Sequence, residues 1–254
     1  GTGTSGFNGD EGSASRTRLD DPTGVAVDAA GDLIVADTGN CRLRMVAAAS
    51  GTRFGVTMVE GRIYTVAGNG ICGSAGDGGL ALHAELWDPG ALALDANGDV
   101  LITDQGNRTI RELAAHAGTF FSVSLAQDHL GTIAGEGSYG PYLVDGQSSL
   151  GQIAEINFPT GIAIDAAGNL YIADGDMHVI RLVPDTATPL LGTTAQADDM
   201  YIAAGALSAG SLRNRTTWIQ TRLIEPTGLA VSPGGRLVYS DTEANAVRML
   251  PAGR

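Results

Sequence analysis

The sequence predicts an all-β protein built from four copies of one four-stranded antiparallel unit, and three observations carry this prediction. The 254 residues include 37 glycines without a collagen-like period, which is typical of many tight turns between short strands. Short apolar runs alternate with turn residues. A segment of about 25 residues that opens on a proline recurs four times along the chain, at Pro22, Pro89, Pro159 and Pro226.

The first two strands of each copy form a predicted hairpin. An apolar stretch with alternating small residues is expected as the first strand, at 24–28, 90–95, 161–165 and 228–232. Alternating small residues suit the crowded hub of a ring of strands. A short link containing glycine follows in every copy and indicates a hairpin. The second strand then ends on a polar residue that is the same in all copies: Asp37, Asp104, Asp174 and Asp241.

Two further strands complete the unit. The third strand is predicted at 42–47, 109–114, 179–183 and 246–250, and a fourth follows in three copies, at 63–68, 131–135 and 200–205. Four strands in a unit of about 40–70 residues are typical of a β-propeller blade. We therefore expect one propeller domain or segment over 1–254. Its repeats cover 22–88, 89–158, 159–225 and 226–254, after a leading loop at 1–21.

The repeated motif resembles the NHL repeat in its bacterial form. The stretch PTGVAVDAAGDLIVADTGNCRLR at 22–44 and the glycine-rich loop at 65–79 carry the resemblance. The resemblance implies a fold and not a reaction. Propellers of this family serve as protein- or RNA-binding scaffolds and as extracellular sensor or adhesion modules, and a few are lyases or hydrolases. Inserts at 48–62 and 115–130 depart from the family pattern.

The last copy lacks its fourth strand, because the sequence starts just after such a strand and stops just after a third one. Three interpretations are open: a segment of a longer propeller, a four-bladed ring with a three-stranded last blade, or an edge paired by another chain. Unpaired backbone groups at a sheet edge are a template for a further strand. We expect such pairing, with residues beyond Arg254 of a longer parent chain or with a neighbouring subunit, along Ala246, Val247, Arg248, Met249 and Leu250.

The repeated charged residues are interpreted as structural. Each repeated aspartate is followed seven residues later by an arginine: Arg44, Arg111, Arg181 and Arg248. A catalytic residue normally occurs once, so these pairs are expected to cap turns and link strands. The histidines are predicted to lie on different faces of the ring and not to form a zinc site: His83, His116, His129 and His178. No catalytic or metal-binding residue is predicted.

Calcium is the one cofactor considered. The acidic glycine loops at 8–11 and 69–79 offer oxygen ligands of the kind that Ca²⁺ takes. Their spacing matches no EF-hand loop and no calcium-binding nonapeptide repeat. A surface loop of turn residues explains them better.

Charge and hydropathy restrict the partners. The formal net charge is −13, from 15 basic and 28 acidic residues, whereas nucleic-acid binders are usually basic. No apolar run approaches the ~20 residues of a membrane span. The leading hypothesis is a non-catalytic interaction or structural module outside the cytoplasm, which binds a protein partner or its own copies. The alternative is a lyase or hydrolase with a site on the ring axis.

Cys41 and Cys72 are the only cysteines, so a single pairing exists. Cys41 opens the third strand of the first copy, and Cys72 lies just after the fourth strand. Because neighbouring strands run antiparallel, these two ends are expected to meet within the ~4.4–6.8 Å Cα separation of a disulfide. The predicted bridge indicates an oxidising compartment, and hence a secreted or cell-surface protein.

Overall fold

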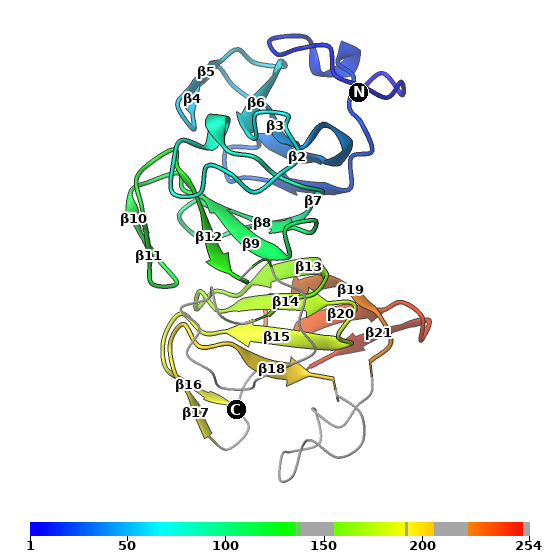
Figure 1. Cartoon of the computed structure of the whole chain (residues 1–254), viewed down its shortest axis with the longest axis vertical. Helices are drawn as coiled ribbons and strands as arrows, with labels where there is room; N and C mark the ends of the chain where they lie inside the picture. The colour runs from blue at the N-terminus through cyan, green and yellow to red at the C-terminus, as the bar shows by residue number, and fades with distance from the viewer. Residues whose placement is uncertain (136, 138–154, 191–192, 206–222, 251–254) are drawn as a thin grey trace. The chain divides into compact units, whose positions relative to one another are not determined.

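The computed structural model describes residues 1–135, 137, 155–190, 193–205 and 223–250, and these consist mostly of short β-strands and turns (Figure 1). Their helical content is three short 3₁₀ turns: η1 at Ala14–Arg16, η2 at Thr38–Asn40 and η3 at Ala81–His83. One antiparallel sheet corresponds to each repeat. The predicted all-β propeller fold, built from four-stranded blades, is confirmed.

The strand order within a blade follows the chain, with the fourth strand outermost. Blade 1 contains β1 (Gly24–Val27), β2 (Leu33–Asp37), β3 (Arg42–Val46) and β6 (Ile63–Ala67). Blade 2 contains β7 (Pro89–Leu94), β8 (Val100–Asp104), β9 (Thr109–Leu113) and β12 (Leu130–Ala134). Blade 3 contains β13 (Pro159–Ile164), β14 (Leu170–Asp174), β15 (Val179–Val183) and β18 (Tyr201–Ala204). Blade 4 has three strands, β19 (Pro226–Val231), β20 (Leu237–Asp241) and β21 (Ala246–Met249).

The insert between the third and fourth strands is a β-hairpin, which the sequence analysis did not predict. The hairpins are β4–β5 (Gly51–Arg53, Val56–Met58), β10–β11 (Gly118–Phe120, Val123–Leu125) and β16–β17 (Thr188–Leu190, Thr193–Ala195). In blade 1 the turn residues Phe54 and Gly55 have φ values of 47° and 71°. Two successive positive φ values are the signature of a type I′ turn. The turn sequence is Phe-Gly and not the usual Asn-Gly, and phenylalanine rarely adopts this conformation. The hairpin therefore could not be recognised from turn residues.

Contacts divide the chain into two compact units, Gly1–Asn107 with Arg111–Thr132, and Arg108–Ile110 with Ile133–Arg254. Each unit has a hydrophobic core between two blades. In the first, one face of blade 1 packs on blade 2 through residues that include Ile34, Leu43, Met45, Leu92 and Leu94. In the second, blade 3 packs on blade 4 through residues that include Ile180, Leu182, Leu229, Val231 and Tyr239. The same repeat positions therefore build both cores.

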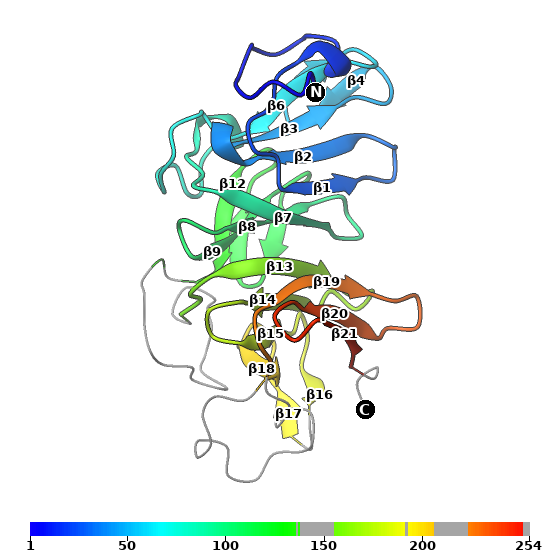
Figure 2. The ribbon, with the colours of Figure 1, turned by 90° about the vertical axis from the view of Figure 1, so that its right-hand side faces the viewer.

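Glycine is required where the first strands of two packed blades meet, β1 with β7 and β13 with β19 (Figure 2). A Cβ atom on Gly24 would lie 2.0 Å from the carbonyl oxygen of Gly90. A Cβ atom on Gly161 would lie 1.9 Å from the carbonyl oxygen of Thr227. No side chain fits at either distance, which explains the small residues in the first strand.

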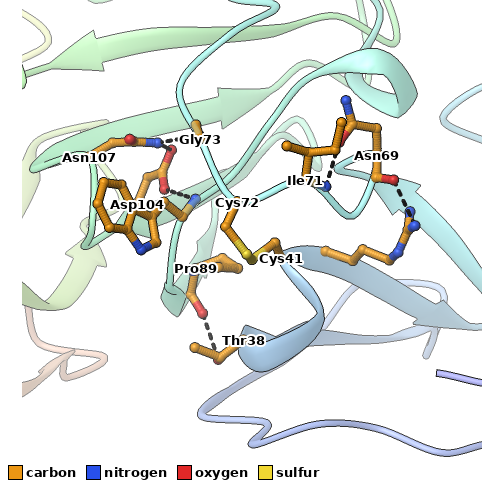
Figure 3. Close-up of a disulfide and its surroundings, with 11 residues drawn as sticks. Thr38, Cys41, Asn69, Ile71, Cys72, Gly73, Pro89, Asp104 and Asn107 are labelled. Carbon is orange, nitrogen blue, oxygen red and sulfur yellow. Dashed lines mark hydrogen bonds between the residues drawn. A yellow bond between two sulfur atoms is a disulfide. The ribbon is translucent and has the colours of Figure 1, made fainter. Parts of the chain in front are cut away.

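A hydroxyl group accompanies each of these close approaches. The Thr38 hydroxyl donates to the carbonyl oxygen of Pro89 at 2.7 Å (Figure 3). The Thr160 hydroxyl donates to the carbonyl oxygen of Pro226, also at 2.7 Å. The proline that opens a repeat is thus held by the preceding blade.

The structure joins Cys41 and Cys72 by a disulfide, as predicted, with a Cα separation of 5.3 Å (Figure 3). Cys41 is buried in the turn before β3 and has a φ of 52°. Cys72 lies in the loop at 68–88 that leads from β6 into blade 2. The bridge therefore fixes this loop to the end of blade 1.

Removal of the disulfide is expected to lower the free energy of unfolding by about 3–4 kcal/mol, because the bridge closes a long loop in the unfolded chain. Urea denaturation with and without reductant measures this difference. The Cys41→Ser/Cys72→Ser double variant is the control, and reductant is expected to leave its midpoint unchanged. Equal midpoints for the oxidised and reduced natural chain would contradict the prediction.

Candidate functional site

The repeated aspartates form buried polar sites, one in each blade. Each lies at the end of its second strand with no exposed surface: Asp37, Asp104, Asp174 and Asp241. The arginine of the neighbouring third strand reaches each of them, with N–O distances of 3.2, 3.1, 2.8 and 2.8 Å for Arg44, Arg111, Arg181 and Arg248. The structure therefore brings every predicted pair together inside its own blade.

Each aspartate also holds the chain that enters its blade. It accepts a hydrogen bond from the backbone N–H of the residue two positions before the proline of the repeat: Asp20, Trp87, Asn157 and Ile224. In blade 2, burial raises the pKa of Asp104, while hydrogen bonds from Asn107 and Trp87 and the charge of Arg111 oppose this shift. The four carboxylates thus bind backbone N–H groups and arginines of their own blade. A structural role of this kind explains why the same residue occurs in every repeat.

A second set of carboxylates, missed by the sequence analysis, completes this network in the first unit. Asp10 lies 2.8 Å from Arg44, and Asp77 lies 2.9 Å from Arg111. Both belong to the acidic glycine loops considered for calcium, where they bind guanidinium groups instead. A sequence signal existed, because both stand in a Gly-Asp-x-Gly segment twelve residues before the proline of their repeat.

The loops that contain Asp10 and Asp77 also cover the outer edges of blades 1 and 2. The backbone N–H of Glu11 donates to the carbonyl of Ile63 in β6, and that of Gly78 donates to Leu130 in β12. An open sheet edge is a template for a further strand, so this cover protects the fourth strand. The loops that lead into blades 3 and 4 lie outside the described residues, apart from their last few positions.

Blade 4 presents a different surface. Within the described residues, no strand pairs with the outer edge of β21. The side chains of Val247 and Met249 are 76% and 50% exposed. The equivalent residues of blade 1, Leu43 and Met45, are fully buried. Apolar side chains at positions that are buried elsewhere mark this blade as the candidate interaction site.

The described histidines have separate surroundings. His129 forms a β-bridge with Leu80, the His83 carbonyl accepts from the Asn69 side chain, and the His178 ring accepts from the backbone N–H of Glu225. In the part of the chain that the structure describes, no three His, Cys, Asp or Glu residues are grouped to hold a metal ion. None of the described helices has the length and apolar character needed to span a membrane.

Glu112 is an exception among the buried acids. It takes the position held by Met45 in blade 1 and is 2% exposed. Its Oε2 atom and the Oδ2 atom of Asp99 have no hydrogen-bond partner in the described part of the structure. Asp32, the counterpart of Asp99, pairs with Arg53 at 2.8 Å, but Phe120 replaces that arginine in blade 2. Burial, followed by the charges of Asp99 and Asp95, raises the pKa of Glu112 to about 9.

Stability is expected to fall as the pH rises, because native Glu112 keeps a proton that the unfolded chain releases above its ordinary pKa of 4.5. Between about pH 5 and pH 8 the contribution is about 1.4 kcal/mol per pH unit. Glu112→Gln is expected to remove this slope, as measured by urea denaturation at several pH values. Glu60→Gln, at an exposed position, is the control and should keep it. A slope that survives in Glu112→Gln would show that Glu112 is not its source.

Comparisons with known proteins agree with this architecture. A family model described as NHL repeat matches residues 19–44. No curated protein sequence matches the chain. An auxiliary nutrient binding protein from Bacteroides thetaiotaomicron is similar over 92% of this chain, with 14% identity and a TM-score of 0.57. A protein assigned as a gluconolactonase has 14% identity over 91% and a TM-score of 0.51, and a chain of the nidogen/laminin complex has 17% identity over 90% and a TM-score of 0.50.

These solved structures share a fold with the chain and extend beyond it. The match covers 48% of the nutrient binding protein and 60% of each of the other two chains. The first repeat carries the family motif, and three further copies repeat it in both sequence and blade structure. Residues 19–44 thus match the NHL repeat, and the chain as a whole has the fold of a β-propeller built from repeated blades.

Proposed function

We propose that the chain is a non-catalytic protein-interaction module that works outside the cytoplasm, and that blade 4 binds a β-strand of its partner. The observation that carries this proposal is the outer edge of β21. No strand of the described residues pairs with it, whereas the three other blades have a fourth strand at this position. Addition of a partner strand to an open sheet edge is a common mode of protein recognition. The Cys41–Cys72 disulfide supports an oxidising compartment.

The other blades predict the register of the bound strand. In blade 1, Leu43 pairs with Ala67 and Arg44 pairs with Thr65, with a bulge between these pairs. Blade 3 has the same bulge between its corresponding pairs. A strand bound to blade 4 is therefore expected to place an alanine opposite Val247 and the residue two positions earlier opposite Arg248.

The end of the bound strand is expected to be glycine. Gly68 follows β6 with a φ of 87°, and a Cβ atom on it would lie 2.4 Å from the carbonyl oxygen of Cys41. Gly205 makes the same approach to His178. Asn245, with a φ of 51°, repeats in blade 4 the left-handed conformation of Cys41. The turn that receives such a glycine is thus already formed.

The competing hypothesis is a lyase or hydrolase with a site on the propeller axis. The similarity to a protein assigned as a gluconolactonase is one of fold. Since the repeated carboxylates are held by backbone amides and arginines, the structure favours the interaction hypothesis.

A peptide with the sequence of residues 60–69, which contains β6, is expected to bind the chain and to shift the backbone amide resonances of 246–250. The reason is that β6 has the residues that the edge of blade 4 is expected to accept. Titration followed by NMR measures both the affinity and the binding position.

Two control peptides test the details. A Gly68→Val peptide is expected to bind at least about tenfold more weakly, because its side chain clashes with the turn. A Tyr64→Pro peptide lacks the backbone donor at the position that pairs with Met45 in blade 1 and should also lose affinity. Equal binding of all three peptides, or shifts confined to residues outside 246–250, would contradict strand addition at β21.

A further inference from the structure

We propose that blade 2 binds a guanidinium cation from outside the chain at the carboxyl groups of Asp99 and Glu112. Both residues belong to the first compact unit, and the site is independent of the strand addition proposed at blade 4. The corresponding positions of blades 1 and 3 show what blade 2 lacks.

Blade 1 holds a guanidinium group at this place. The Oδ1 atom of Asp32 accepts a hydrogen bond from the backbone N–H of Ala48 at 2.7 Å, and its Oδ2 atom accepts one from the Nε atom of Arg53 at 2.8 Å. The side chain of Asp32 has no exposed surface, whereas that of Arg53 is 31% exposed. The guanidinium group of the β4–β5 hairpin therefore reaches a buried carboxylate from the surface.

Asp99 has the same orientation without the guanidinium group. Its Oδ1 atom accepts a hydrogen bond at 2.6 Å from the backbone N–H of Ala115, the residue that corresponds to Ala48. Its Oδ2 atom has no hydrogen-bond partner among the described residues, and Phe120 takes the place of Arg53. The unpaired oxygen therefore points toward the position where blade 1 holds the Nε atom of an arginine.

Blade 3 removes the charge together with the arginine. Asn169 replaces the aspartate, and its Oδ1 atom accepts a hydrogen bond from the backbone N–H of Asp185 at 3.3 Å. Leu190 stands at the position of Arg53. Because a buried charge is costly without a partner, an amide without an arginine is a balanced solution. Blade 2 keeps the acid and lacks the base.

Glu112 adds a second carboxyl group where blade 1 has an apolar contact. Met45 pairs with Tyr64 across the sheet in blade 1, and the corresponding residues of blade 2 are Glu112 and Gly131. Glu112 is 2% exposed, and its Oε2 atom has no partner among the described residues. A Cβ atom on Gly131 would lie 2.5 Å from the Cδ2 atom of Leu125, so the end of a flexible leucine takes the place of a phenol ring.

Two unpaired carboxyl oxygens and the loss of a ring beside them suit a planar cation with several donors. A guanidinium group has N–H donors in a fixed fork that matches carboxylate oxygens. Its approach corresponds to that of Arg53 in blade 1, past the half-buried side chain of Phe120.

The cation is expected to bind with release of a proton. Burial, followed by the charges of Asp99 and Asp95, raises the pKa of Glu112 to about 9, so this carboxyl group is protonated at neutral pH in the absence of a cation. Burial also raises the pKa of Asp99, which His116 and the backbone N–H of Ala115 oppose. Since a bound cation favours the carboxylate form, its affinity is expected to rise by up to about tenfold per pH unit from about pH 6 to about pH 8.

Isothermal titration calorimetry with ethylguanidinium at about pH 8 tests the proposal, and one ion is expected to bind per chain. Asp99→Asn copies blade 3 and is expected to weaken binding at least about tenfold. Phe120→Arg supplies the arginine of blade 1 and should block the site in the same way. Thr119→Arg is the matched control, because it adds the same charge at the adjacent exposed position and should keep the affinity.

Urea denaturation distinguishes a blocked site from a misfolded chain. Phe120→Arg is expected to raise the urea midpoint, since it pairs a buried carboxylate, and Thr119→Arg should leave the midpoint unchanged. A natural chain that does not bind ethylguanidinium, or binding that survives in both Asp99→Asn and Phe120→Arg, overturns the proposal. Neither outcome depends on peptide binding at β21.

Two further titrations identify the source of the guanidinium group. Binding of agmatine but not of a short peptide with a central arginine assigns the site to a small molecule. Binding of the peptide assigns it to the side chain of a protein partner. Binding of Ca²⁺ at these carboxylates without binding of any guanidinium compound would contradict the proposed ligand class.

Discussion

The buried aspartate at the end of each second strand is the contact on which the blade depends. A buried charge is costly unless it is paired and hydrogen-bonded, so its surroundings must supply partners. At Asp37 these are the Arg44 guanidinium, the Asn40 amide and the backbone N–H of Asp20. One carboxylate thereby fixes the third strand, the turn before it and the chain that enters the blade. This local requirement explains why the residue recurs in every copy.

Much of this architecture follows from the sequence because its determinants are local. The strands, the hairpin turns and the disulfide arise from neighbouring strands within one repeat. The carboxylates of Asp10 and Asp77 could not be placed in the same way, because their arginines lie 34 residues further along the chain. The hairpin at Phe54 was missed because its turn departs from residue preferences. The exposure of Val247 could not be predicted from the sequence, because it stands out only when the structure is used to compare this residue with its buried equivalents in the other blades.

The surroundings of Glu112 show the effect of losing one ion pair that another blade contains. In blade 1 the hairpin residue Arg53 neutralises Asp32, and the adjacent strand carries Met45. Blade 2 has neither feature, and the Oε2 atom of Glu112 and the Oδ2 atom of Asp99 have no hydrogen-bond partner among the described residues. Burial, followed by the charges of Asp99 and Asp95, favours the protonated carboxyl group, and this is the origin of the raised pKa of Glu112.

The edge of blade 4 and one of its sheet faces are physically coupled. A fourth strand contributes alternate side chains to the sheet face that packs on the next blade: in blade 1, Tyr64 and Ala67 of β6 lie in the same core as Leu43 and Met45. A strand added at β21 is therefore expected to extend the sheet face that carries Val247 and Met249 as well as to pair with the edge.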